Sequence, residues 1–219
     1  MCRFLLFKSE EKLNPEPILR DFAEMCRVSR TEDEDWQGDG WGAAWFDEKG
    51  NWQVKKSLLP IWKDRNEFKS IPGTNILVAH ARSASFDEHK GNVDFNEPYL
   101  KGGYCYVFNG MLKGVKLVAE GRIGAQKVWS LLQNELVTSK PLQALENINR
   151  MLRKNSRTIR GLNIGLATKD SFFALCGKQG DSDYFTLRKM RGDDIQIICS
   201  EEIGDYQFEK MKENETIAL

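Results

Sequence analysis

Short apolar segments of strand type fill both ends of the chain, and three helical stretches interrupt them. Helices are predicted at 15–28, 124–136 and 142–152. Strands are predicted at 2–7, 41–46, 52–58, 76–81, 104–108, 162–168, 172–175, 184–191 and 195–199, the last four as a meander. Strands and helices therefore come in separate runs. This order predicts an α+β fold with mostly antiparallel sheets and argues against a doubly wound parallel sheet.

Size and charge are those of an ordinary globular protein. The chain has 219 residues, 41% of them hydrophobic, with 32 Lys+Arg against 32 Asp+Glu. A chain of this length buries about 70% of its unfolded surface, and a net charge of zero disfavours a nucleic-acid or membrane-surface partner. No apolar run approaches the roughly 18 residues of a membrane span. We expect one soluble domain over 2–219, with an acidic solvated loop at 31–35.

The cysteines indicate a reducing environment. The five cysteines are widely spaced, odd in number and free of any C-x-x-C pair, and the chain has only two histidines. That pattern contains no zinc or iron–sulfur spacing. Without a secretion signal, it predicts a cytoplasmic protein that uses no metal.

Cys2 is the residue with the most direct chemical meaning. Methionine is commonly removed before a small residue, which would leave a cysteine at the amino terminus. Its α-amine, with a pKa of about 7.7–8.0, could then take the proton of its own thiol, so that one residue supplies nucleophile and base. The alternative is a small apolar residue that happens to follow the start codon.

Further motifs accompany Cys2 in a fixed order. They are Met-Cys-Arg-Phe-Leu at 1–5, Gly-Asp-Gly-Trp-Gly at 38–42, His-Ala-Arg-Ser-Ala-Ser at 80–85, Phe-Asn-Gly at 108–110, Leu-Asn-Ile at 162–164 and Cys-Ser-Glu-Glu at 199–202. Together they resemble the class II glutamine amidotransferases, which are N-terminal-nucleophile (Ntn) hydrolases, in the stand-alone form that opens with Met-Cys-Arg. The resemblance covers most of the chain and implies a four-layer αββα sandwich without metal or cofactor.

The resemblance also implies roles for individual residues. Cys2 would be the nucleophile, and Asn109 with the backbone N–H of Gly110 would form the oxyanion hole. Arg82 would hold the substrate carboxylate through a two-pronged contact. Ser85, where the family usually has threonine, would add a hydroxyl donor.

Simpler interpretations of the same residues stay open. Arg82 could be a surface ion-pair partner, and Asn109-Gly110 could be a plain hairpin turn. Trp41 is expected to support the fold, His80 to be a buried strand residue, and Arg3 to face solvent.

Two departures from the family pattern concern the substrate amine. Relatives that use free glutamine carry an aspartate in the first turn of the helix after Asn-Gly, whereas this chain has Gly124-Ala125 there. The family's Asn-x-His-Pro stretch is replaced by Asn96-Glu97-Pro98, and Glu97 could supply the missing negative charge. A buried ammonium without a counter-charge is costly, so the identity of the substrate stays open.

The resulting expectation is an amidohydrolase of glutaminase type. It would cleave the side-chain amide of glutamine or of a γ-glutamyl compound through a Cys2 thioester. Two alternatives remain: a hydrolase specific for a substituted γ-glutamyl amide, and a non-catalytic subunit or small-molecule binding module. Any ammonia would be released or passed to an ammonia-accepting partner protein.

Overall fold

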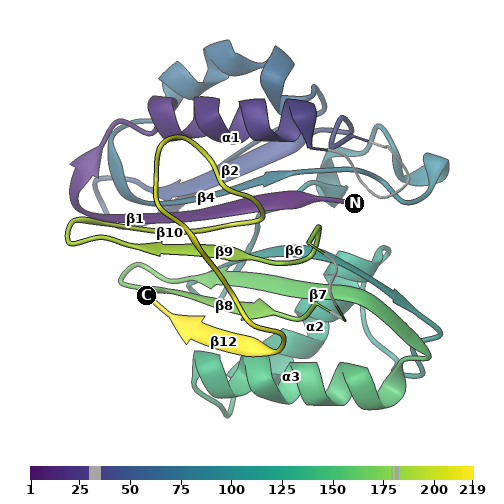
Figure 1. Ribbon diagram of the computed structural model, residues 1–219. Coiled ribbons are helices and arrows are strands. Elements are labelled where there is room, and N and C mark those ends of the chain that lie inside the picture. Colours follow the sequence, from purple (N-terminus) through teal and green to yellow (C-terminus); the bar gives the residue numbers. More distant parts are fainter. Residues whose placement is uncertain (30–35, 179, 181–182) are drawn as a thin grey trace.

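Two antiparallel sheets stack face to face between layers of helix (Figure 1). The computed structural model describes residues 1–29, 36–178, 180 and 183–219, so the acidic stretch at 31–35 lies outside the described residues. The larger sheet has the strand order β11-β9-β10-β1-β4-β2-β3, and the smaller sheet has the order β12-β8-β7-β6-β5. The strands are β1 Arg3–Leu13, β2 Trp41–Phe46, β3 Trp52–Ser57, β4 Thr74–Ala81, β5 Tyr99–Lys101, β6 Tyr104–Lys113, β7 Thr158–Ala167, β8 Phe172–Cys176, β9 Arg188–Arg191, β10 Ile195–Cys199, β11 Glu209–Lys210 and β12 Glu215–Ala218.

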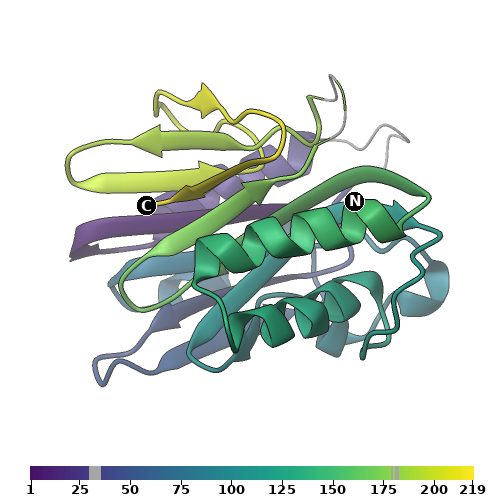
Figure 2. The same cartoon turned by 90° about the horizontal axis from the view of Figure 1, so that it is seen from below.

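Helices close the outer faces of both sheets. Helix α1 (Glu16–Val28) covers the larger sheet, and α2 (Gly124–Leu136) and α3 (Pro141–Asn155) cover the smaller one, as Figure 2 shows from below. The predicted αββα sandwich is confirmed. So are the helices near 15–28, 124–136 and 142–152.

Strand β1 separates the two halves of the interior. Its Leu5 and Phe7 pack toward α1, while Phe4 and Leu6 pack toward the smaller sheet. Side chains alternate between the faces of a strand, so Cys2, just before β1, belongs to the same face as Phe4 and Leu6. Cys2 is therefore directed into the space between the sheets.

The structure corrects three sequence predictions. Strand β6 continues through Asn109-Gly110 to Lys113, so the plain hairpin turn is wrong. Strand β1 runs on to Leu13, well beyond the predicted end at residue 7. The predicted meander is split, because β7 and β8 lie in the smaller sheet whereas β9 and β10 lie in the larger one. The chain crosses between the sheets at 184–187, where Leu187 packs in the core between them.

The cysteines and helices add two plain findings. All five cysteines are free thiols, and four of them are buried. Within the described residues, no helix is long and apolar enough to cross a membrane.

Candidate active site

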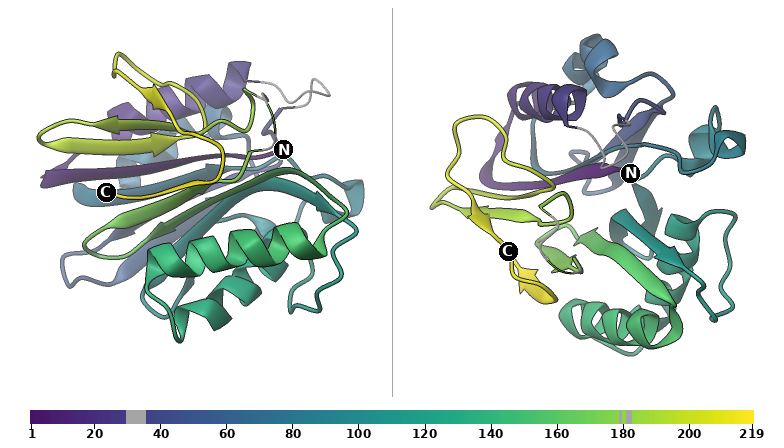
Figure 3. Two further views of the ribbon diagram at one scale, coloured as in Figure 1. Left: turned by 60° about the horizontal axis from the view of Figure 1, so that its bottom comes forward. Right: turned by 45° about the vertical axis from the view of Figure 1, so that its right-hand side comes forward.

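Cys2 lies at the wall of a cavity of about 420 Å³. The cavity lies at the end of the sandwich where β1 begins, marked N in Figure 3. The Cys2 Sγ is 3.7 Å from the carbonyl oxygen of Ser83. Burial raises the pKa of the Cys2 thiol above its usual value, so a neutral thiol is the resting form and a nearby base is needed to activate it.

The chain around Cys2 is held from several directions. Arg3 is 1% exposed, forms an ion pair with Glu201, and donates to the Ser29 Oγ (2.9 Å) and the Tyr184 carbonyl (2.8 Å). The Tyr184 hydroxyl in turn donates to the carbonyl of Met1 (2.9 Å). The prediction that Arg3 faces solvent is therefore wrong. The buried Arg3 and its partners therefore hold the start of β1, next to Cys2, in place.

Met1 itself occupies part of the site. It is 7% exposed and lines the same cavity as Cys2. Removing Met1 would therefore do two things at once. It would create the α-amine of Cys2, and it would open space in the cavity next to the thiol.

Arg82 follows β4 and is directed into the cavity. It is 4% exposed, and its Nη2 donates to the His89 carbonyl (2.8 Å) while its Nη1 has no partner among the described residues. A surface ion-pair role is therefore wrong. A buried guanidinium with a free N–H edge is suited to a carboxylate ligand. Ser85 lies at the exposed rim of the same cavity.

Asn109 and Gly110 are adjacent on β6 but contribute differently. Gly110 lines the cavity. Asn109 is fully buried and lies on the same face of β6 as Val107, which packs between the two sheets. Neither amide atom of Asn109 has a hydrogen-bond partner in the described part of the chain. Buried amide groups without a hydrogen-bond partner are rare, and this one is suited to binding a ligand. A Cβ at Gly110 would collide with the Gly161 carbonyl on β7, so close strand packing requires this glycine.

Two buried side chains contact the backbone of Phe108, the residue before Asn109. Glu97 accepts a hydrogen bond from the Phe108 N–H, and the His80 Nε2 lies 3.3 Å from the Phe108 carbonyl and 3.7 Å from Glu97. Burial lowers the pKa of His80 to about 3, so His80 is neutral and is not a base at neutral pH. Burial also raises the pKa of Glu97 well above its usual value, despite opposing effects of the Phe108 hydrogen bond and of Lys56 and Arg82.

The Gly-Asp-Gly-Trp-Gly segment braces both sides of this site. The Asp39 carboxylate accepts from the Ala84 N–H (2.7 Å), and the Arg82 N–H donates to the Gly40 carbonyl (2.9 Å). Gly42 passes so close to the Glu97 carbonyl that a Cβ would collide with it. Trp41 is buried and donates to Asp64 (3.0 Å), as expected for a supporting residue. The role of Asp39 has no local signal in the sequence, because its partner Ala84 lies far along the chain.

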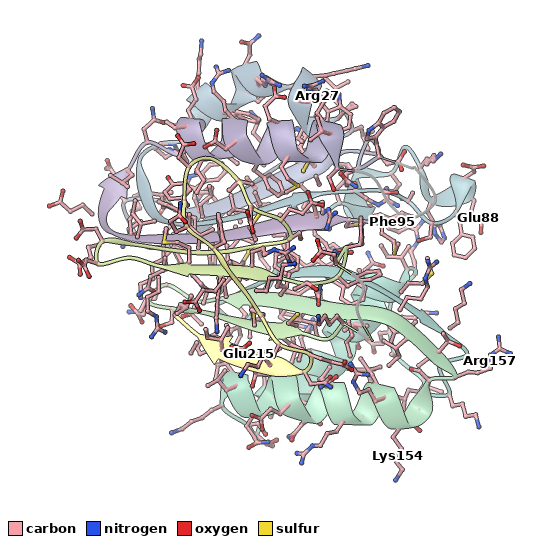
Figure 4. The ribbon with its side chains drawn as sticks, viewed as in Figure 1. Arg27, Glu88, Phe95, Lys154, Arg157 and Glu215 are labelled. Atoms are coloured by element: carbon pink, nitrogen blue, oxygen red, sulfur yellow. The ribbon has the colours of Figure 1, made fainter. Side chains whose placement is uncertain are left out.

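The first turn of α2 forms another wall of the cavity. Gly124 and Ala125 line it, and this turn carries no acidic residue. Phe95, labelled in Figure 4, lines the cavity as well, and its ring lies under the guanidinium groups of Arg82 and Arg122. Of the residues expected at the site, Cys2, Arg82, Ser85 and Gly110 share one cavity, and Asn109 lies next to it.

Comparison with known proteins supports the fold. No protein-family model matches the sequence, and no curated protein matches it either. Among solved structures, a protein from Silicibacter pomeroyi described as a glutamine aminotransferase class-II domain protein matches with a TM-score of 0.62 and 12% identity, over 99% of this chain and 94% of that one. A "predicted glutamine amidotransferase" from Pseudomonas aeruginosa matches with a TM-score of 0.53 and 13% identity, over 100% and 93% of the two chains.

A larger enzyme shares the same fold in part of its length. The glutamine phosphoribosylpyrophosphate amidotransferase of B. subtilis matches with a TM-score of 0.69 and 12% identity, over 99% of this chain and 47% of that one. The present chain thus spans about half of that enzyme. At these identities the likeness establishes the fold alone, an αββα sandwich shared with these glutamine amidotransferase structures.

Proposed function

We propose that the protein is an amidohydrolase that cleaves the side-chain amide of glutamine or of a γ-glutamyl compound through a thioester on Cys2. One observation supports the proposal most directly: Cys2 and the buried Arg82, whose Nη1 has no hydrogen-bond partner among the described residues, line one cavity. A ligand whose carboxylate pairs with Arg82 would hold an amide within reach of the thiol. The shared fold is consistent with this chemistry.

The first half-reaction forms the thioester. After removal of Met1, the α-amine of Cys2 takes the thiol proton, and the sulfur attacks the amide carbonyl carbon. As the C–S bond forms, the carbonyl electron pair moves to oxygen. Asn109 Nδ2 and the Gly110 N–H stabilise this oxyanion. Collapse of the intermediate breaks the C–N bond, and the α-ammonium returns its proton to the departing ammonia.

The second half-reaction restores the enzyme. A water molecule gives a proton to the α-amine and attacks the thioester carbonyl. The new oxyanion occupies the same position as the first. Its collapse breaks the C–S bond, and the sulfur takes the proton back, which releases a carboxylic acid and the free thiol.

Ammonia release tests the proposal directly. We expect the wild type to hydrolyse at least one compound of a panel containing glutamine and a γ-glutamyl anilide, measured as released ammonia for the first and as released aniline for the second. Cys2→Ala should abolish release and keep the fold by circular dichroism. Cys176→Ala is the matched control, because it removes a buried thiol in β8 outside the cavity. Full turnover by Cys2→Ala would refute the mechanism.

A second candidate, a hydrolase of substituted γ-glutamyl amides, is favoured by the size of the cavity. At about 420 Å³ it lies in the range of pockets that bury ligands considerably larger than an amino acid. Faster turnover of the anilide than of glutamine would support this candidate. Activity that appears only with a co-purified chain would instead indicate an ammonia-accepting partner.

A further inference from the structure

The cavity has two chemically different ends. Cys2, Arg82 and Gly110 form the polar end, with Asn109 next to it. Apolar side chains of β6, of the loop after it and of α2 form the apolar part of the lining. Leu112, Ile123 and Val128 are among them. A ligand anchored at the polar end would therefore place its remaining part against an apolar wall.

The charges around the cavity are unfavourable for an ammonium group. Arg82, Lys113 and Lys127 contribute cationic side chains to its lining. Glu97 is the single carboxyl among the described lining residues. One of its oxygens already accepts from the Phe108 N–H, and burial raises its pKa, which favours the uncharged form. An ammonium bound here would have no counter-charge, and such a group is costly to desolvate.

We propose that the preferred ligand is an ω-amide of glutamine type whose α-nitrogen carries an apolar acyl group, so that it is uncharged. This inference rests on the proposed amidohydrolase function and narrows its substrate class. The carboxylate pairs with Arg82, and the acyl group lies against the apolar wall formed by Leu112, Ile123 and Val128. Free glutamine would lose this apolar contact and bring an unpaired charge.

Binding to an inactive variant separates this inference from the question of turnover. Cys2→Ala keeps a small second residue and therefore permits removal of Met1, which intact mass can verify. Calorimetric titration of this variant with N-phenylacetylglutamine and with glutamine should give at least a tenfold lower Kd for the acylated compound. Equal or tighter binding of glutamine would overturn the inference, and so would binding of neither compound.

The proposed function is judged by a different readout. If the wild type releases ammonia from glutamine but the acylated compound binds no better, the substrate inference fails and the amidohydrolase survives. If the acylated compound binds more tightly to Cys2→Ala but the wild type releases no ammonia from any amide, the function fails and the ligand class stands.

Gly124 offers a sharper test of the missing charge. It lines the cavity in the first turn of α2, and a Cβ there would meet no atom within 4 Å. Gly124→Asp should add a carboxylate without a clash, at a helix end that tolerates negative charge. In the Cys2→Ala background it should reduce the preference for the acylated compound about tenfold or more. Gly124→Asn, of equal size but neutral, should leave the preference unchanged, and equal ratios for Asp and Asn would overturn the role assigned to charge.

Discussion

Replacing Glu97 by glutamine tests whether this buried carboxyl is neutral in the folded protein. Glutamine has nearly the same size and keeps a carbonyl oxygen that can accept from the Phe108 N–H. The hydrogen bond between residue 97 and the Phe108 backbone is therefore kept. The substitution removes the ionisable proton of the Glu97 carboxyl. Its effect on stability should therefore depend on pH rather than appear as a constant loss.

The sign follows from proton uptake. The pKa of Glu97 is raised from its usual 4.5, so above that pH the folded state holds a proton that the unfolded state has released. The contribution of Glu97 is fully present below the unfolded pKa and is lost as pH rises, at about 1.4 kcal/mol per pH unit until the folded carboxyl ionises. His80, with its pKa lowered from 6.5 to about 3, has the opposite slope below pH 6.5. In the wild type the two slopes largely cancel between these unfolded pKa values.

In Glu97→Gln, the rise of stability with pH that His80 causes should no longer be cancelled. Urea unfolding followed by tryptophan fluorescence, at several pH values from about 5 to 8, should show the variant gaining stability relative to the wild type as pH rises. Glu48→Gln, in an exposed turn, is the matched control and should run parallel to the wild type. Parallel curves for Glu97→Gln, or a loss of stability that grows with pH, would show that Glu97 is ionised and paired rather than neutral.

Three further expectations concern Asn109, Gly110 and the α-amine of Cys2. Asn109→Ala should lower kcat by about 10²–10³ with little change in KM, measured by steady-state ammonia release, because the oxyanion loses a donor. Gly110→Ala should lower the free energy of unfolding by about 1–3 kcal/mol in a urea titration, because its Cβ collides with the Gly161 carbonyl. The kcat/KM of the wild type should rise with pH through a pKa of about 7.7–8.0, that of a free α-amine, and a flat profile across this range would exclude the amine as base.

Local periodicity was sufficient to predict much of the fold. Helix α1 follows from apolar residues that recur every three to four positions, and the hairpin of β2 and β3 from two strand-like runs around a turn. The long-range corrections had no local signal. Asn109-Gly110 has the composition of a hairpin turn, yet β6 continues there because Gly110 packs against Gly161 of the neighbouring strand.

The candidate site was predictable in part for a similar reason. Cys2 and Arg82 could be selected by their chemistry and their motifs, and both line the cavity. Arg3 was expected at the surface because its partners, Tyr184 and Glu201, are separated from it by most of the chain. Glu97 lies much closer in sequence to Phe108, but its hydrogen bond with the Phe108 N–H depends on how β5 pairs with β6, which no local pattern predicts.

The proposed chemistry requires Cys2 to become an amino-terminal nucleophile inside an amide-binding cavity. The most direct measurement is the intact mass of the purified protein before and after incubation with diazo-ketone analogues of glutamine and of N-acylglutamine. We expect a chain without Met1 that gains a single adduct from at least one analogue, on the peptide beginning with Cys2, and no adduct in Cys2→Ala. A chain that retains Met1, an adduct on one of the four buried cysteines, or no adduct with either analogue would contradict this expectation.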